Sequence, residues 1–341
     1  MKSHTVPKKL LEQFTYAEPR TRTLRLWRYE KGRKPYGKAS PDSATVVEGI
    51  YSDPRDAEKE AELEQRLNQE FEDPVHQFIH QAGFRTFVPS TAHIKKLTAY
   101  ITLLFHRSTA RRAATQQQVD ALVTSCRSLL ENEEQLRAIA GKWTLNLVER
   151  GHQLIVSIQD VRNAIQKMID DQLAKDQLQH TYAGTMERAM SRFDGHMLNG
   201  KWDLLHAKPD EPFVIGDAPV VTWERTERNF LIYGQGFSRP NVEAFLPISP
   251  IACLHVQPSV RRDRRVMTPT TREVNSAQAS YSTRYCYTNV RSGALDAVLR
   301  PHFGRTILGV NAFSIRHRDY RNAIFDILMN DGRWVEPPNL I

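Results

Sequence analysis

The sequence contains three regions that favour different secondary structure, and their order limits the folds open to the chain. Residues 1–52 are strand-prone, residues 53–200 show helical patterns, and residues 201–341 contain short strands separated by Pro, Gly and Asn, with closing helices. Strands followed by helices and then by strands are typical of α+β proteins. We therefore predict one α+β domain over residues 1–341, in which a central helical bundle is flanked by N-terminal and C-terminal strands that form one sheet.

The middle region carries the apolar spacing of amphipathic helices. In residues 153–174 the apolar side chains recur at intervals of three or four residues, at Ile158, Val161, Ile165 and Ile169. This spacing places them on one helix face. Several such segments follow one another, which predicts packed helices rather than a single long one.

The charge balance favours an acidic partner. The chain has 47 Lys and Arg against 39 Asp and Glu, a formal net charge of +8. Such an excess favours nucleic acid first and an anionic membrane surface second, with simple solubility as the alternative. No apolar run reaches the length of a membrane span, and the N-terminus lacks the apolar core of a secretory signal. The three scattered cysteines fit a reducing compartment, so we predict a cytoplasmic protein without a membrane partner.

Asp217 is the most prominent candidate for chemistry. It interrupts a short apolar strand, residues 213–221, between Gly216 and Pro219. A carboxylate at the end of a buried strand is held rigidly and needs partners for its charge. Asp217 is therefore either a metal ligand or general base, or a structural residue that forms an ion pair or an Asx turn.

The N-terminus supplies a second candidate group. His4 precedes Lys8 and Lys9 at the start of a short amphipathic turn. One interpretation makes His4 a general base or metal ligand and assigns both lysines to nucleic-acid binding. The other makes His4 a capping histidine or one at the edge of the core.

An acidic run over residues 56–72 supplies carboxylates for a metal. Glu60 and Glu64 are four residues apart and share a helix face, so both can reach one ion. Glu70 lies about 120° around the helix axis from Glu64, so it joins such a site only through a kink or an intervening contact. The alternative is a solvent-exposed charged face.

Two basic clusters favour phosphate contacts. One ends an apolar helix and contains Arg107, Arg111 and Arg112. Arginines there complement the helix dipole, and their planar guanidinium groups also suit phosphate. The densest cluster contains Arg261, Arg262, Arg264 and Arg265. It predicts a loop tip that either contacts phosphates or keeps the protein soluble.

Several well-known motifs are missing from the sequence. It contains no G-x-x-x-x-G-K-[ST], G-x-G-x-x-G, G-x-S-x-G or H-E-x-x-H pattern. P-loop nucleotide hydrolysis, dinucleotide redox chemistry and serine hydrolysis therefore lose support.

These short motifs resemble a bacterial family, the domain of unknown function 4238, over nearly the whole chain. The resemblance implies a shared fold and no particular reaction. The residues that carry it are His4, Val6, Pro7, Leu11, Phe14, Tyr51, Ser52, Leu63, Glu64, Leu67, Glu70, Arg107, Trp202, Asp217, Pro219, Asn275, Tyr285, Cys286 and Tyr287.

Together these features give two functional hypotheses. The first is a nucleic-acid-acting protein, a metal-dependent nuclease of the toxin or phage-defence type that hydrolyses phosphodiesters. Its metal, Mg²⁺ or Mn²⁺, would be held by His4, Glu64 and Asp217, with Glu70 nearby and Arg107 on the phosphate. The second is a non-catalytic module that binds nucleic acid or a protein partner in a larger complex.

Overall fold

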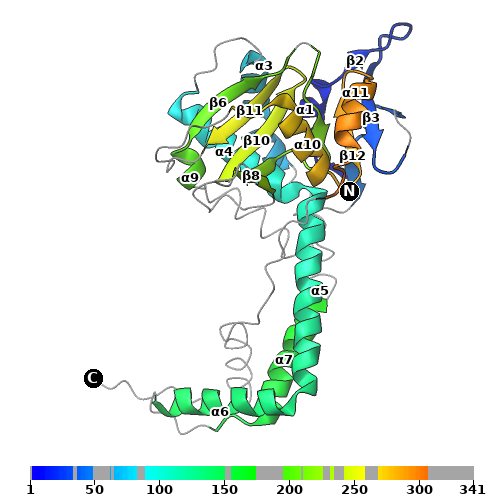
Figure 1. Cartoon of the computed structure of the whole chain (residues 1–341). Coiled ribbons are helices and arrows are strands. Elements are labelled where there is room, and N and C mark those ends of the chain that lie inside the picture. The colour runs from blue at the N-terminus through cyan, green and yellow to red at the C-terminus, as the bar shows by residue number, and fades with distance from the viewer. Residues whose placement is uncertain are drawn as a thin grey trace. The chain divides into compact units, whose positions relative to one another are not determined.

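The computed structural model describes residues 2–33, 37–48, 62, 65–82, 89–149, 155–173, 195–208, 210–225, 231–233, 242–257 and 268–305. The chain forms two compact units. One comprises residues 1–114 and 181–309, and the other comprises residues 115–180 and 310–341. Helices and strands are both abundant, as labelled in Figure 1, which confirms the α+β class. The helical region predicted for residues 53–200 is divided between the two units.

One sheet of the first unit joins the two ends of the sequence. Strand β3 (Leu24–Glu30) pairs antiparallel with β12 (Tyr285–Thr288). N-terminal and C-terminal strands therefore share a sheet, as the sequence predicted. The remaining strands of this sheet are β2 (Tyr16–Ala17) and β4 (Gly37–Ala39), which pair with β3, and β7 (Ile215–Gly216), which pairs with β12.

A second sheet is built from C-terminal strands alone, which the prediction of one sheet did not include. Its order is β6-β11-β10-β8-β9, and all its pairs are antiparallel. Its members are β6 (Lys201–His206), β11 (Ala252–Gln257), β10 (Val242–Ser249), β8 (Val221–Arg225) and β9 (Leu231–Tyr233). Strands β1 (Lys2–His4) and β5 (Val46–Glu48) form a separate antiparallel ribbon.

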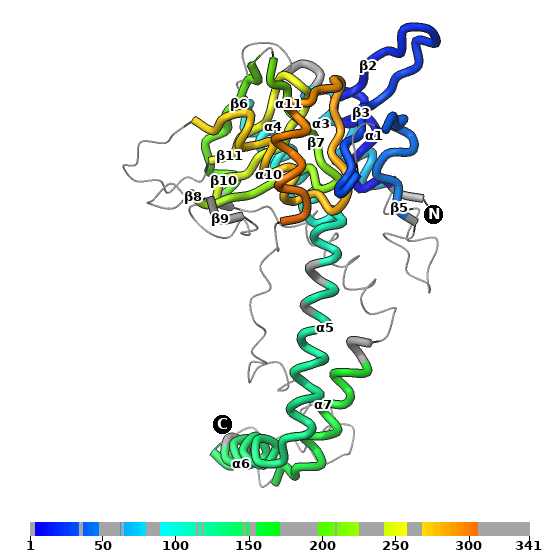
Figure 2. The backbone as a smooth tube through the Cα atoms, turned by 45° about the vertical axis from the view of Figure 1, so that its right-hand side comes forward, coloured from blue at the N-terminus to red at the C-terminus, as the bar shows by residue number. Residues whose placement is uncertain are grey.

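Helix α10 (Thr271–Tyr281) lies between the two five-stranded sheets (Figure 2). It begins with a capping box in which the Thr270 hydroxyl accepts from the Glu273 amide. At its other end the Tyr281 hydroxyl donates to the carbonyl oxygen of Thr222 in β8 at 2.5 Å. The helix therefore fixes β8 relative to the strands that surround Asp217.

Further helices of the first unit pack beside the sheets. Helix α4 (Thr91–Arg107) buries Leu97, Tyr100, Ile101 and Leu104 in a core shared with Phe245 and Leu254 of the second sheet. The other helices are α1 (Lys8–Glu12), the π-helix η1 (Leu67–Glu72), α3 (Asp73–Ala82), α9 (Gly195–Leu198) and α11 (Gly293–Leu299).

The second unit has its own apolar core. Helix α5 (Thr109–Glu131) begins in the first unit and ends in the second, where α6 (Glu133–Glu149) and α7 (Ile158–Leu173) follow. Leu136 and Trp143 of α6 pack with Ile165 of α7 in this core. No helix among the described residues is long and apolar enough to cross a membrane.

His76 gives the first unit an acid-sensitive element. It lies edge-on to Tyr100, with ring centroids 5.7 Å apart. Burial, followed by the charge of Lys9, lowers the pKa of His76 from 6.5 to about 4, and Asp73 opposes that shift. Because the unfolded chain takes up this proton first, the contribution to stability is complete above pH 6.5 and is lost as the pH falls toward 4.

As the pH falls from 6.5 to 4, we expect protonation of His76 in the unfolded chain to lower the free energy of unfolding by up to about 3 kcal/mol. Urea unfolding at pH 7, 5.5 and 4 measures the change. A His76→Gln variant should lose less stability than the wild type over the same range. Equal losses in both proteins would show that His76 does not cause the acid sensitivity.

Candidate functional site

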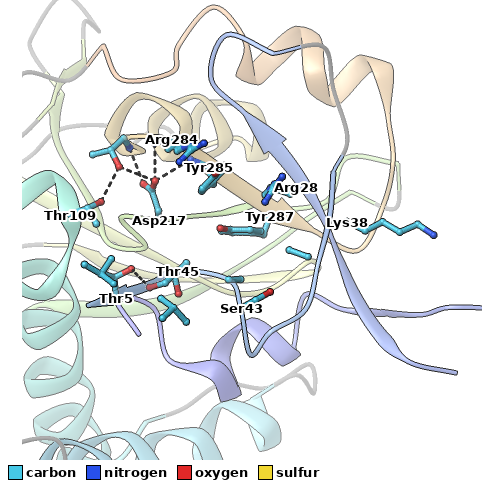
Figure 3. A pocket seen from close by; sticks show the side chains of 15 residues that line it. Thr5, Arg28, Lys38, Ser43, Thr45, Thr109, Asp217, Arg284, Tyr285 and Tyr287 are labelled. Carbon is cyan, nitrogen blue, oxygen red and sulfur yellow. Dashed lines mark hydrogen bonds between the residues drawn. The ribbon is translucent and has the colours of Figure 1, made fainter. Parts of the chain in front are cut away.

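A cavity of about 410 Å³ opens beside the sheet that joins the chain ends. Its walls come from the N-terminal ribbon, from β3 and β4, from the first turn of α5 and from the segment that enters β12 (Figure 3). All of these segments belong to the first unit. The polar lining residues are Thr5, Arg28, Lys38, Ser43, Thr45, Thr109, Asp217, Thr283, Arg284, Tyr285 and Tyr287.

Asp217 organises one wall of this cavity. Its Oδ1 accepts the Thr283 amide at 2.8 Å. Its Oδ2 accepts the Thr283 hydroxyl at 2.9 Å and the amides of Arg284 and Tyr285 at 2.8 and 3.0 Å. Burial raises the pKa of the Asp217 carboxyl, and these hydrogen bonds oppose the shift. The carboxylate therefore holds the turn that leads into β12, as its structural interpretation requires.

Two amide side chains of α10 fix the segment that carries Asp217. Gln278 accepts the Gly216 amide at 2.8 Å and donates to the Pro219 carbonyl oxygen at 2.7 Å, and Asn275 accepts the Val214 amide at 2.9 Å. A Cβ on Gly216 would overlap the hydroxyl of Ser282. Glycine is therefore required at this position because α10 approaches the strand closely.

Two guanidinium groups flank one aromatic ring at the cavity. The guanidinium carbons of Arg28 and Arg284 lie 4.9 and 4.8 Å from the ring centroid of Tyr285. Glu30 accepts a hydrogen bond from Arg284 at 3.0 Å and lies 3.9 Å from Arg28. Among the described residues, no acceptor reaches the buried Nε of Arg28. Arg28 lines the cavity, and its side chain as a whole is 33% exposed.

Hydroxyl groups also line the cavity. The Thr5 hydroxyl donates to the Thr45 carbonyl oxygen at 3.2 Å, and the hydroxyls of Thr109 and Thr283 are 3.0 Å apart. The Tyr287 hydroxyl bonds to the backbone of Thr45, and burial raises the pKa of Tyr287 well above its usual value. Tyr287 therefore stays protonated at neutral pH and presents a neutral polar group.

The predicted residues His4 and Arg107 lie in the elements beside the cavity. His4 Nδ1 is 3.0 Å from the Ala44 carbonyl oxygen. Burial lowers the pKa of His4, and the charge of Arg107 lowers it further. Their sequence neighbours Thr5 and Thr109 line the cavity together with Asp217. The fold thus brings the N-terminus, the end of α4 and the Asp217 turn into one region.

Arg107 is almost completely buried and makes an ion pair. Its Nη1 lies 2.5 Å from Glu72 Oε1, and the two side chains are 1% and 8% exposed. Glu70, in contrast, is exposed and lies 3.4 Å from Arg66 one helical turn away. Glu72, which the sequence did not single out, is therefore the carboxylate that faces Arg107.

Other predicted residues lie apart from the cavity lining. Lys8 and Lys9 form exposed ion pairs with Asp42 and Asp73 at 2.5 and 2.6 Å. Arg111 lies 5.7 Å from the Phe105 ring centroid, and Arg112 is half-buried in the first turns of α5.

The remaining predictions fall on residues outside the described part of the chain. These residues are Glu60, Glu64, Arg261, Arg262, Arg264 and Arg265. Within the described ranges, no group of three or more His, Cys, Asp or Glu side chains is placed to hold a metal ion. The predicted set of His4, Glu64 and Asp217 stays a prediction, since Glu64 is not described.

Sequence reasoning missed the residues that give the cavity its cationic groups. Arg28 lies in β3, and Tyr285 is the first residue of β12. Tyr287 is paired directly with Arg28 across the sheet. Because this pairing joins segments far apart in the sequence, no local pattern could reveal it.

The fold and the cavity define an α+β protein with a binding site made of arginine, tyrosine and hydroxyl groups. Residues 2–292 match the family model described as protein of unknown function DUF4238. The chain therefore belongs to this family, as the short motifs around His4, Asp217 and Tyr285 indicated. Neither a curated protein nor a solved structure matches the chain significantly.

Proposed function

We propose that the protein binds nucleic acid and that the cavity holds one phosphate-bearing nucleotide of the bound strand. The observation that carries this proposal is Arg28, whose side chain lines the cavity, is 33% exposed and lies beside the Tyr285 ring. A phosphate oxygen is the acceptor that suits a guanidinium group best, because the contact is charge-assisted.

The size and lining of the cavity support a ligand with both a charged and a planar part. Its volume of about 410 Å³ lies within the range of small-molecule sites. The Thr and Tyr hydroxyls offer neutral hydrogen-bonding groups beside the arginines. The net charge of +8 favours an anionic partner over the whole surface.

Binding accounts for the arrangement better than hydrolysis does. Asp217 accepts four hydrogen bonds from its turn, and Arg107 faces Glu72 in the interior. These contacts explain both side chains without a role in chemistry. Metal-dependent cleavage remains a prediction that concerns His4, Glu64 and Glu70 as well.

An Arg28→Gln variant tests the proposal. Fluorescence anisotropy with labelled single-stranded RNA, single-stranded DNA and duplex DNA, at several salt concentrations, measures the affinity. We expect the variant to bind single strands about tenfold more weakly, because a charge-assisted contact is lost. The dependence of log K on log salt should become shallower by about 0.7.

Arg272→Gln is the matched control, since Arg272 is exposed and lies at the opposite end of α10 from the Asp217 turn. It should bind as the wild type does. Failure of the wild type to bind any of the three probes would refute the proposal, and so would equal affinities of the Arg28→Gln variant and the wild type. The same probes with Mg²⁺ or Mn²⁺, followed on denaturing gels, test cleavage separately.

A further inference from the structure

The β2–β3 hairpin carries a second cluster of aromatic and basic groups, on the other side of the sheet from Arg28. Adjacent residues of a strand point to opposite faces, so Trp27 lies on the face away from Arg28. We call this cluster the hairpin face. It consists of Tyr16, Arg25, Trp27, Lys38 and Arg291 with the hairpin-tip residues Arg20 and Arg22.

The hairpin face has an aromatic centre. The rings of Tyr16 and Trp27 are stacked, with centroids 5.3 Å apart and planes 10° from parallel. Lys38 Nζ and the Arg291 guanidinium carbon each lie 5.8 Å from the Trp27 ring centroid. Both rings are half-buried, so each keeps part of its surface accessible. Aromatic rings beside basic groups are the usual platform for an unpaired base and its phosphate.

The charges of this face favour an anionic partner. Arg20 and Arg22 are exposed, and within the part of the chain that the structure describes neither makes an ion pair. Glu18, the acid beside the hairpin tip, pairs with Lys38 and lies 3.9 Å from Arg25. Figures 1 and 2 both show the loop between β2 and β3 extending away from the rest of the first unit.

We infer that the nucleic acid is single-stranded and that it continues from the cavity onto the hairpin face, where a base stacks on the aromatic pair formed by Tyr16 and Trp27. This inference rests on the proposed function, because it extends the strand whose nucleotide occupies the cavity. Lys38 connects the cavity with the hairpin face. Lys38 is one of the residues that line the cavity (Figure 3). Its ammonium group lies 5.8 Å from the centroid of the Trp27 ring. In a duplex, both faces of each base are covered by its neighbours, so only an unpaired base can stack on this aromatic pair.

The test compares Trp27→Leu, Trp27→Phe and the double variant Arg20→Gln/Arg22→Gln with the wild type. Anisotropy with a 12-nucleotide single strand and the matching duplex measures affinity against salt. We expect Trp27→Leu to bind the single strand about tenfold more weakly and Trp27→Phe to recover most of that loss. Duplex affinity should change little. The double variant should make the single-strand salt dependence shallower by about 1.4.

Lys95→Gln/Lys96→Gln removes two exposed charges from α4 and is the matched control, which should keep the wild-type salt dependence. If Arg28→Gln weakens binding and the hairpin variants do not, the inference is wrong while the proposed function stands. If Arg28→Gln binds normally, the proposed function fails. Equal wild-type affinity for duplex and single strand would also overturn the inference. If Trp27→Leu does not fold, the salt dependence of the Arg20→Gln/Arg22→Gln variant, which is changed only at exposed positions, tests the inference.

Discussion

Replacing Asp217 with alanine should lower the free energy of unfolding by about 3 to 5 kcal/mol. The substitution removes four hydrogen bonds and leaves the amides of Thr283, Arg284 and Tyr285 without their acceptor. A buried amide that loses its acceptor is costly because water does not replace the bond. Urea unfolding of the wild type and the variant measures the difference.

Asp217→Asn separates the charge from the shape of this side chain. An amide oxygen at the position of Oδ2 keeps three of the four hydrogen bonds, and the amide nitrogen then faces the Thr283 amide. We expect an intermediate loss of about 1 to 2 kcal/mol. Asp210→Ala, in an exposed turn, is the control and should change stability by less than about 0.5 kcal/mol. A wild-type stability for Asp217→Ala would contradict the structural role.

Replacing Arg107 with methionine should destabilise the protein by about 3 to 5 kcal/mol. The substitution takes away the positive charge 2.5 Å from Glu72 Oε1, in a place where both side chains are nearly inaccessible to water. Removing one member of a buried ion pair is expensive because the other charge stays in a poorly solvated environment. Thermal and urea unfolding both report this loss.

A double-mutant cycle with Glu72→Gln distinguishes the ion pair from simple packing. We expect the double variant to be more stable than the sum of the two single losses predicts. Each single variant leaves one buried charge without its partner, whereas the double variant leaves none. Arg137→Met/Glu133→Gln is the matched control, since this pair is exposed, with side chains 73% and 63% accessible. Its coupling should be small. Additive losses for Arg107 and Glu72 would show that the two side chains act independently.

These two predictions affect how activity measurements are interpreted. The sequence predicted Asp217 and Arg107 as residues of a catalytic site, yet each makes contacts that stabilise the fold. A variant of either residue that lacks activity therefore reports on folding as well as on function. The tests of nucleic-acid binding use Arg28, Arg20 and Arg22 because these side chains are at least partly accessible.

Much of the architecture was predictable from local patterns. The apolar spacing of residues 153–174 predicted a helix, and the structure has α7 over Ile158–Leu173. The strand-forming segments at both chain ends predicted a shared sheet, which β3 and β12 form. The second sheet was not predicted, because strand segments in the sequence do not say which of them pair. Its order β6-β11-β10-β8-β9 depends on contacts made only in the folded chain.

The sequence by itself determined the class of the fold, the excess of positive charge and the position of one acid at the end of an apolar strand. These are properties of neighbouring residues or of the whole composition. Only the tertiary structure decided that the Asp217 carboxylate accepts four hydrogen bonds from the turn before β12 and that Arg107 pairs with Glu72. It also placed Arg28 and Arg284 on the same ring, although their positions in the chain are far apart. Strand pairing and side-chain burial set these partners, and neither leaves a local signal in the sequence.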